Sequence, residues 1–153
     1  MYKRIKKNKK AYLDYEIDET FIFWIKLKGF EVKQIRTWNI DIRNAFCHMA
    51  QNELYIHELN IPLYKKTSSS MVPWYESKRK RKLLATKKEL RKLIERTHKT
   101  WLTIIVLEIG QTKKYIKVKC ALAKLRRKIE KKQIIKEKDV ARQMQKEIKN
   151  LKF

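Results

Sequence analysis

The sequence predicts a domain of the α+β class, mainly β with flanking helices, followed by a basic C-terminal tail. Three observations support this prediction. Hydrophobic residues make up 43% of the chain, which is enough to form a core. Several segments alternate apolar and polar side chains with the period of a strand. From residue 125 onward, charged residues dominate and Gly and Pro are absent. We therefore expect a core over residues 1–124 and a tail over residues 125–153.

The N-terminal part predicts a basic arm, a strand and a short helix. Residues 1–12 form the arm, and residues 15–27 alternate as a strand does. Gly29 then ends the strand. Apolar residues spaced by three over residues 32–38 indicate about two turns of amphipathic helix.

The middle of the chain predicts a β-hairpin and a long loop. Residues 46–50 and 54–61 form the two strands, with the turn at Gln51-Asn52. Residues 64–77 are rich in Ser and irregular, so they predict a loop, and a loop of this length in a small domain is usually functional or disordered. The densest charge run, residues 78–82, follows it.

The third part predicts a capped helix and two strands. Thr86 and Glu89 have the spacing of a capping box, in which each side chain accepts from the backbone amide of the other, and the helix then runs to about residue 96. Strands follow over residues 101–109 and 116–122, and the second shows the cleanest alternation in the chain.

The tail carries a narrow apolar stripe at helical spacing, formed by Val140, Met144, Ile148 and Leu151. A stripe this narrow does not bury enough surface to fold alone. We therefore expect the tail to become helical only on a partner.

A formal net charge of +24 indicates a polyanionic partner, because 40 Lys and Arg stand against 16 Asp and Glu. Nucleic acid and an anionic membrane surface are the main candidates. No segment has the roughly 18 apolar residues of a membrane span, and no apolar run follows residues 1–10 as in a secretory signal. These features favour nucleic acid and an intracellular protein.

The sequence contains no recognisable catalytic or metal-binding signature, so we expect neither an enzyme nor a cofactor. Cys47 and Cys120 lack metal-ligand spacing and are expected to be buried, reduced thiols. The three His residues are scattered. The early acids are expected to be a solvated patch that balances the basic arm, with a divalent-ion site as the alternative: Asp14, Glu16, Asp18 and Glu19.

The four Trp residues divide into two groups. Trp24, Trp38 and Trp101 lie in segments with core-like patterns, so we expect them to pack. Trp74 lies in the predicted loop and is the best candidate to stack on an RNA base.

Four sequence blocks, in order and at matching separations, resemble the SsrA-binding protein family. They are Asn8-Lys9-Lys10-Ala11 with Asp14-Tyr15 and Glu19-Thr20; Gly29-Phe30-Glu31-Val32-Lys33-Gln34-Ile35-Arg36; Arg79-Lys80-Arg81-Lys82-Leu83-Leu84 with Lys87-Lys88-Glu89-Leu90; and Leu122-Ala123-Lys124 with Ile135-Lys136-Glu137-Lys138 and Arg142. Together they cover about residues 8–145.

The resemblance implies an OB-like antiparallel β-barrel and an adaptor function in trans-translation. Such a protein binds the tRNA-like domain of transfer-messenger RNA and brings it to stalled ribosomes, where its tail enters the empty message channel as a helix. The partners implied are this RNA and ribosomal RNA at the decoding region, with no membrane and a monomer when free. The compartment implied is the cytoplasm of a bacterium or its equivalent in an organelle.

The resemblance also implies roles for individual residues. The RNA-binding set is Asn8, Lys9, Lys10, Glu31, Lys33, Arg36, Arg79, Arg81 and Lys82, in which Glu31 would accept from base or ribose donors and the last three would hold phosphates. The tail set, expected on the ribosome, is Lys124, Arg126, Arg127, Glu130, Lys131, Lys132, Lys136 and Lys138.

The chain also departs from the family pattern at several positions. The departures are Phe23 and Trp24 in place of small residues, Gln34 for Ser, Thr86 for His, Leu125 for Gly and Ile129 for an aromatic residue. They indicate a divergent member.

Three alternative functions follow from the same composition. A structural ribosomal protein with an OB-like core and a basic extension is the first. A peripheral membrane protein that uses the tail stripe, and a metal-dependent nuclease that uses the early acids, are the others.

Overall fold

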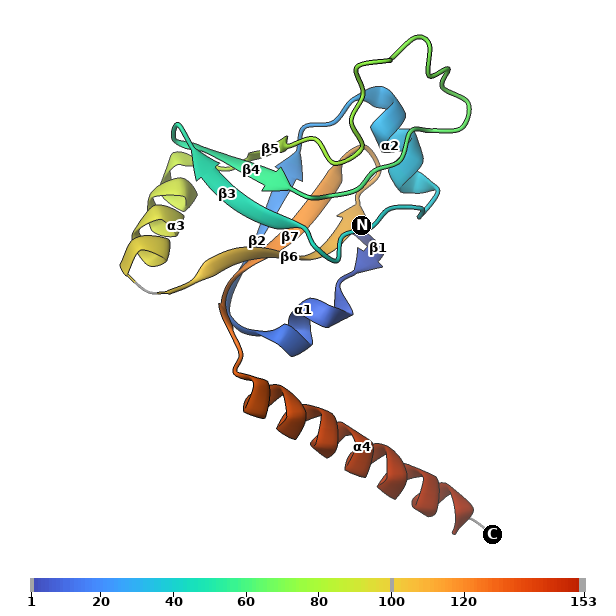
Figure 1. The fold of residues 1–153 in the computed structure, drawn as a ribbon, viewed down its shortest axis with the longest axis vertical. Coiled ribbons are helices and arrows are strands. Elements are labelled where there is room, and N and C mark those ends of the chain that lie inside the picture. Colours follow the sequence, from blue (N-terminus) through green and yellow to red (C-terminus); the bar gives the residue numbers. More distant parts are fainter. Residues whose placement is uncertain (1, 100, 152–153) are drawn as a thin grey trace.

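The computed structural model describes residues 2–99 and 101–151, and it shows a β-barrel with short helices around it and one long helix that leaves it (Figure 1). The elements in chain order are β1 (Lys3–Lys7), α1 (Lys9–Asp14), β2 (Tyr15–Ile25), α2 (Gly29–Arg36), β3 (Phe46–Ala50), β4 (Glu53–His57), β5 (Arg81–Leu84), α3 (Lys87–Lys99), β6 (Thr103–Gln111), β7 (Ile116–Leu125) and α4 (Lys128–Asn150).

The strands of the described residues form one antiparallel sheet in the order β1-β6-β3-β4-β5-β2-β7, and β6 also pairs with β7. This extra pairing closes a ring through β6, β3, β4, β5, β2 and β7, while β1 pairs with a further part of β6. The predicted class, mainly β with flanking helices, is confirmed. The closed ring is the antiparallel barrel that the resemblance implied.

The inside of the barrel is apolar because the strands alternate. On β7, Ile116, Val118 and Cys120 point inward, while the lysines between them face outward. Cys120 lies 3.5 Å, sulfur to sulfur, from Cys47 of β3, and both are buried free cysteines, as predicted. The hydrogen bond between the two sulfurs, together with burial, raises the pKa of Cys120, so this thiol stays protonated.

The β3–β4 hairpin turns where the sequence predicted. Gln51 has φ 51° and Asn52 has φ 61°, the left-handed pair of a type I′ turn. The second strand is shorter than expected, because Glu58 has φ 57° and ends β4 at His57. Ile61 is nevertheless buried, because the chain beyond Glu58 continues across the core.

Helix α3 begins with the predicted capping box. The Thr86 amide donates to Glu89 Oε2 at 2.9 Å, and the Glu89 amide donates to Thr86 Oγ1 at 3.2 Å. The helix runs three residues beyond the predicted end, to Lys99.

Three of the four early acids pair with helices, which corrects the expected solvated patch for those three, while Glu16 is exposed as expected. Glu19 accepts from Lys92 of α3 at 2.5 Å, and Arg96 of α3 contacts both Asp18 and Glu19. Asp14 lies 3.4 Å from Lys131 of α4. The predicted balance with the basic arm was wrong because these acids lie next to α3 and α4 in the fold.

Sequence patterns missed β1, α1 and β5. Strand β1 has a single buried residue, Ile5, so it shows no apolar alternation and forms only because β6 offers an open edge. Helix α1 is short, but Asn8 caps it by accepting from the Ala11 amide at 3.1 Å, a signal that the sequence did contain. Strand β5 was hidden in the charge run, because the residue that points inward beside Leu83 is an arginine, Arg81.

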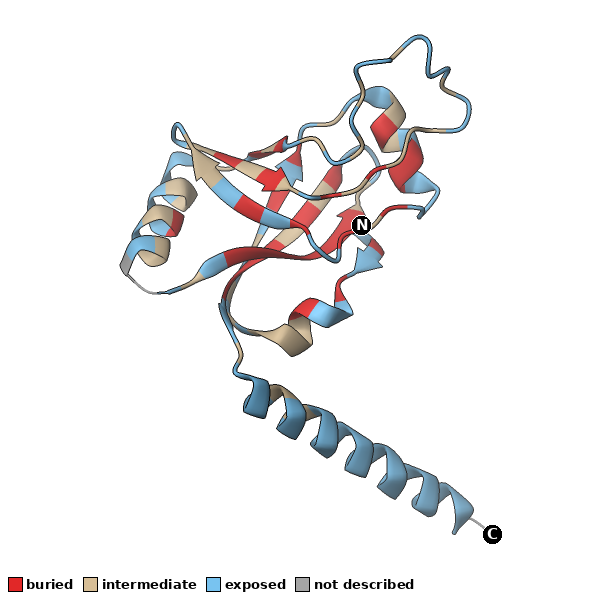
Figure 2. Ribbon diagram, in the orientation of Figure 1, coloured by how far each residue is buried: buried red, intermediate tan, exposed pale blue. Residues whose placement is uncertain are grey.

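The tail forms one helix, α4, and the expectation that this helix depends on a partner stays a prediction. The Arg127 amide donates to Glu130 Oε2 at 3.3 Å, Arg142 and Asp139 pair at 3.8 Å, and the helix has no Gly or Pro. Its 23 residues exceed the roughly 12–15 at which isolated helices become marginal. None of its residues is buried (Figure 2), so the side chains of α4 are accessible to a partner.

Candidate nucleic-acid interface

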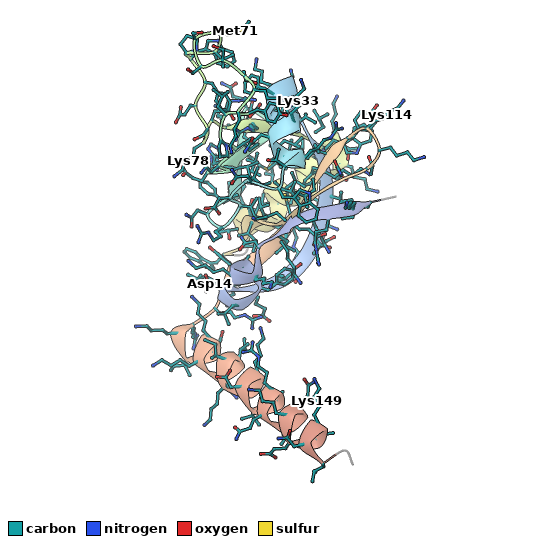
Figure 3. All side chains as sticks on the ribbon, turned by 90° about the vertical axis from the view of Figure 1, so that its right-hand side faces the viewer. Asp14, Lys33, Met71, Lys78, Lys114 and Lys149 are labelled. Carbon is teal, nitrogen blue, oxygen red and sulfur yellow. The ribbon has the colours of Figure 1, made fainter. Side chains whose placement is uncertain are left out.

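Helix α2 separates structural residues from exposed cations. Its inward face buries Gln34 and Ile35, and the Gln34 side chain donates to the Asn39 carbonyl at 2.9 Å. The opposite face presents Lys33 and Arg36 to solvent. Figure 3 shows Lys33 projecting from α2 at the end of the barrel farthest from α4. A cationic helix face at the end of a barrel is suited to contact phosphates.

A buried ion cluster fixes this helix to β5. Glu31 of α2 accepts from Arg81 Nε at 2.5 Å and also from Arg79. The remaining Arg81 nitrogens donate to the Leu59 carbonyl at 2.7 Å and to the Ser77 carbonyl at 2.9 Å. The Tyr75 hydroxyl donates to the Ile61 carbonyl at 2.6 Å and accepts from Arg81 at 3.1 Å. We call Glu31, Arg79, Arg81 and Tyr75 the Glu31 cluster.

The cluster keeps Glu31 ionised. Burial pushes the pKa of Glu31 upward, but hydrogen bonds from Arg79, from the Lys28 amide and from Arg81 outweigh it and hold the pKa below its ordinary value. The side chains of Glu31 and Arg81 are fully buried, whereas that of Arg79 is 26% exposed.

Two of the expected RNA contacts are enclosed in this structure. The Glu31 carboxylate and the Arg81 guanidinium are buried and already bonded to each other and to the backbone, so neither is open to solvent. Their bonds join α2 to β5, and a direct contact of either with RNA stays a prediction. Arg79 and Lys82 remain accessible at the surface, although Lys82 donates to Glu53 at 2.8 Å.

The N-terminal candidates divide in the same way. Asn8 is buried, and its amide donates to the Ile42 carbonyl at 3.3 Å and the Val106 carbonyl at 3.2 Å. This side chain caps α1 and ties it to the barrel, so it is not open to solvent, and its expected contact with RNA stays a prediction. Lys9 and Lys10, in the first turn of α1, are exposed.

Trp74 lies where a stacking residue is useful. It is 58% exposed in the loop beside α2, packs against Phe30 and has the Lys28 ammonium 5.2 Å from its ring. The prediction that the other three Trp residues pack in the core was wrong. Trp24, Trp38 and Trp101 are 45%, 48% and 95% exposed.

The reason is the position of each residue in its element. Trp24 falls on the outward phase of β2, and the neighbouring Phe23 takes the core position. Trp38 follows α2 with φ 69°, which turns it out of the helical face. Trp101 precedes the first residue of β6.

The tail candidates follow the end of the barrel. Lys131 is partly covered by its contact with Asp14, and the Arg126 amide donates to the Asp14 carbonyl at 2.8 Å. Figure 3 shows Asp14 beside the start of α4 and Lys149 near its far end. The exposed members of the set are Lys124, Arg127, Glu130, Lys132, Lys136 and Lys138. Leu125 and Ile129, the departures in this region, are also exposed.

Two features of the described residues bear on the alternative functions. Among residues 2–99 and 101–151, no group of three or more His, Cys, Asp and Glu could hold a metal ion. No described helix is both long enough and apolar enough to cross a membrane.

Comparison with known proteins gives consistent matches. The family model for the SmpB protein matches residues 5–150. An SsrA-binding protein of Mesomycoplasma hyopneumoniae (strain 232) is 40% identical over 144 residues, covering 94% of this chain and 95% of the relative. One from Mycoplasma mycoides subsp. mycoides SC is 38% identical over 148 residues, covering 97% of each.

The fold also matches a solved structure. A chain described as "tmRNA-SmpB: a journey to the center of the bacterial ribosome" superposes with a TM-score of 0.65 at 36% identity. The match covers 85% of this chain and 93% of the other.

Proposed function

Because the chain belongs to the SsrA-binding protein (SmpB) family, we propose that it is the RNA-binding adaptor of trans-translation. It binds the tRNA-like domain of transfer-messenger RNA and brings that RNA to stalled ribosomes. The observation that carries this conclusion is the family match over residues 5–150, which includes both the barrel and α4. The net charge of +24 gives the attraction for two RNA partners.

The division of labour has a structural basis. The barrel with α1, α2 and α3 forms one body, and α4 leaves it after Arg127 with no buried residue. In our proposal the core spans residues 1–124 and the tail begins at 125, near the end of β7, where Leu125 pairs with Tyr15. In our proposal the core holds the transfer-messenger RNA and α4 contacts the ribosome.

The RNA-contacting residues we propose on the core are the cations of the expected set that reach the surface. They are the exposed Lys9, Lys10, Lys33 and Arg36 and the partly exposed Arg79 and Lys82. Asn8, Glu31 and Arg81 act indirectly, because they hold α1, α2 and β5 in place. Trp74 is proposed to stack on an unpaired base next to this surface.

The tail residues proposed to meet ribosomal RNA are Lys124, Arg126, Arg127, Lys131, Lys132, Lys136 and Lys138, while Glu130 caps α4. We also propose that the adaptor has no catalytic activity of its own, is a monomer when free, and works in the cytoplasm of its cell or the matching compartment of an organelle.

The function is tested by sequencing the RNA that co-purifies with the protein. A transfer-messenger RNA recovered at near one-to-one ratio is the expected result. Recovery of intact ribosomal subunits in constant proportion, without that RNA, would indicate a structural ribosomal protein instead.

The affinity for the tRNA-like RNA is expected to fall steeply with salt. Each phosphate neutralised by Lys or Arg adds about 0.9 to the slope of log affinity against log salt on a duplex. The slope is measured by filter binding between low and physiological salt. Lys33→Gln should reduce this slope by about 0.9, the contribution of one phosphate. A nearly flat dependence of affinity on salt would contradict the proposed cationic surface.

A further inference from the structure

The outer face of the barrel carries an exposed aromatic pair that the proposed core surface does not include. Trp24 of β2 and Tyr115, just before β7, stack with ring centroids 4.9 Å apart and planes at 5°. Trp24 is 45% exposed and Tyr115 52% exposed, so much of both rings remains open to solvent. Tyr115 lies at the start of the strand that faces β2 in the barrel.

Apolar neighbours extend this pair across three strands. Leu84 of β5 lies opposite Trp24, and Ile22 lies two residues before it on the same face of β2. Both are about half exposed. A contiguous exposed apolar patch of this kind on a folded domain commonly marks a binding site.

Lysines surround the patch. Lys117 lies opposite Trp24, with its ammonium 5.9 Å from the indole ring, and Lys119 lies opposite Ile22. Lys26 is exposed just past the end of β2, two residues after Trp24, and Lys113 and Lys114 form the exposed tip of the β6–β7 hairpin. Figure 3 shows Lys114 at this tip, projecting away from the body of the molecule.

The acidic residue that lies opposite one of these lysines, Glu108, already has partners. Glu108 of β6 lies opposite Lys119, but it is buried, accepts from the Tyr2 hydroxyl at 3.2 Å and lies 3.9 Å from Arg4. The field over the aromatic pair is therefore set by lysines. Proteins that bind single-stranded nucleic acid combine an exposed aromatic ring with nearby cations. The base stacks on the ring, and the phosphates of the backbone contact the lysines.

We propose that this face, formed by Ile22, Trp24, Leu84, Tyr115, Lys117 and Lys119 and called here the Trp24 platform, is a second RNA site that stacks an unpaired base. The charge complementarity favours RNA over a protein partner, because a protein segment that covered Trp24 would also have to neutralise the lysines. The site goes beyond the proposed function, since it needs a single-stranded nucleotide and no tRNA-like shape. The α2 surface is formed by helix side chains, whereas the platform is formed by the strands β2, β5 and β7 and the residue before β7.

The test is the affinity of the full-length protein for a fluorescein-labelled oligouridine of about ten nucleotides, measured by anisotropy at fixed salt. Trp24→Leu keeps an apolar side chain but removes the ring, and it is expected to weaken binding roughly tenfold, the loss of one stacked base. Trp24→Phe keeps a ring and should stay within about threefold of the native protein. Trp101→Leu removes a more exposed Trp away from the platform and should leave affinity unchanged.

A second variant and a spectroscopic readout protect the test against misfolding. Tyr115→Leu changes the other ring at the exposed start of β7 and is expected to give a similar loss. A base that stacks on indole quenches its fluorescence, so oligouridine should quench the native protein more than Trp24→Phe. Unchanged affinity in Trp24→Leu and Tyr115→Leu, or equal losses in Trp24→Leu and Trp24→Phe, would overturn the proposal. If Trp24→Leu and Tyr115→Leu bind oligouridine as the native protein does but lose ribosome rescue, the platform would be assigned to a protein partner. That result would also overturn the proposal.

Discussion

Replacing Glu31 by alanine is expected to lower the free energy of unfolding by about 3–5 kcal/mol. The buried Glu31 carboxylate accepts hydrogen bonds from Arg79, Arg81 and the Lys28 amide. Its removal leaves the fully buried Arg81 guanidinium without a counter-charge. The arginine cannot deprotonate, so the native state would contain an unpaired buried charge, which lowers its stability.

The measurement is urea unfolding followed by circular dichroism. Glu53→Ala is the matched control, because Glu53 also pairs with a β5 cation, Lys82, but at the surface, where a pair contributes little. RNA affinity should fall in Glu31→Ala only as far as the folded fraction falls. A stable Glu31→Ala protein with weakened RNA binding would instead show that the carboxylate contacts RNA.

The same pair gives a pH dependence with a definite sign. The folded-state pKa of Glu31 is lowered below its ordinary value of 4.5, because hydrogen bonds from Arg79, the Lys28 amide and Arg81 outweigh burial. The stability from this group is therefore complete above pH 4.5 and is lost as the pH falls through the lower folded-state pKa. The free energies of unfolding of the native protein and of Glu31→Gln, measured as the pH is lowered, should converge in this range. Parallel curves would contradict the assignment.

Deleting residues 128–153 is expected to abolish ribosome rescue while transfer-messenger RNA binding persists. The deletion starts after β7 and after the Arg126 amide, which donates to the Asp14 carbonyl, so the barrel keeps its last strand pairing. It removes α4, none of whose residues is buried, and the core should therefore still fold. The exposed cations of α1 and α2, and the partly exposed Lys82 of β5, remain on the truncated protein.

RNA binding and rescue should be measured on the same truncated protein, in a reconstituted translation system. Val140→Pro in the full chain is the matched control, since it retains every tail charge but breaks α4 in its exposed interior. Loss of rescue in this variant would show that the tail acts as a helix and not as a flexible cationic chain. Full rescue by the deletion protein, or loss of RNA binding from a folded core, would contradict the division of labour.

Local sequence patterns predicted much of the fold because the relevant interactions are short-range. The alternation over 116–122 predicted β7, the Gln51-Asn52 pair predicted the hairpin turn, and Thr86 with Glu89 predicted the start of α3. In each case the residues that define the element are a few positions apart. Strand β1 could not be predicted this way, because its partner β6 lies about a hundred residues further along the chain.

The candidate interface was predicted less well than the fold. Sequence blocks found the segments that carry it, but they did not separate solvated cations from buried ones. Arg79 and Arg81 are two residues apart in one charge run, yet one is partly exposed and the other fully buried. The aromatic residues show the same limit, since Trp24 looked like core but lies outside.

The sequence by itself determined the charge, the family resemblance, the strand-rich class and the separation of a polar tail from the core. Each of these depends on composition or on neighbours within a few residues. Only the tertiary structure decided which polar side chains are sites and which are supports. Glu31 and Arg81 are 50 residues apart in the chain, and they meet because the barrel brings α2 against β5. The free energy of a charged group depends on the groups and the solvent around it, and those are fixed only when the chain has folded.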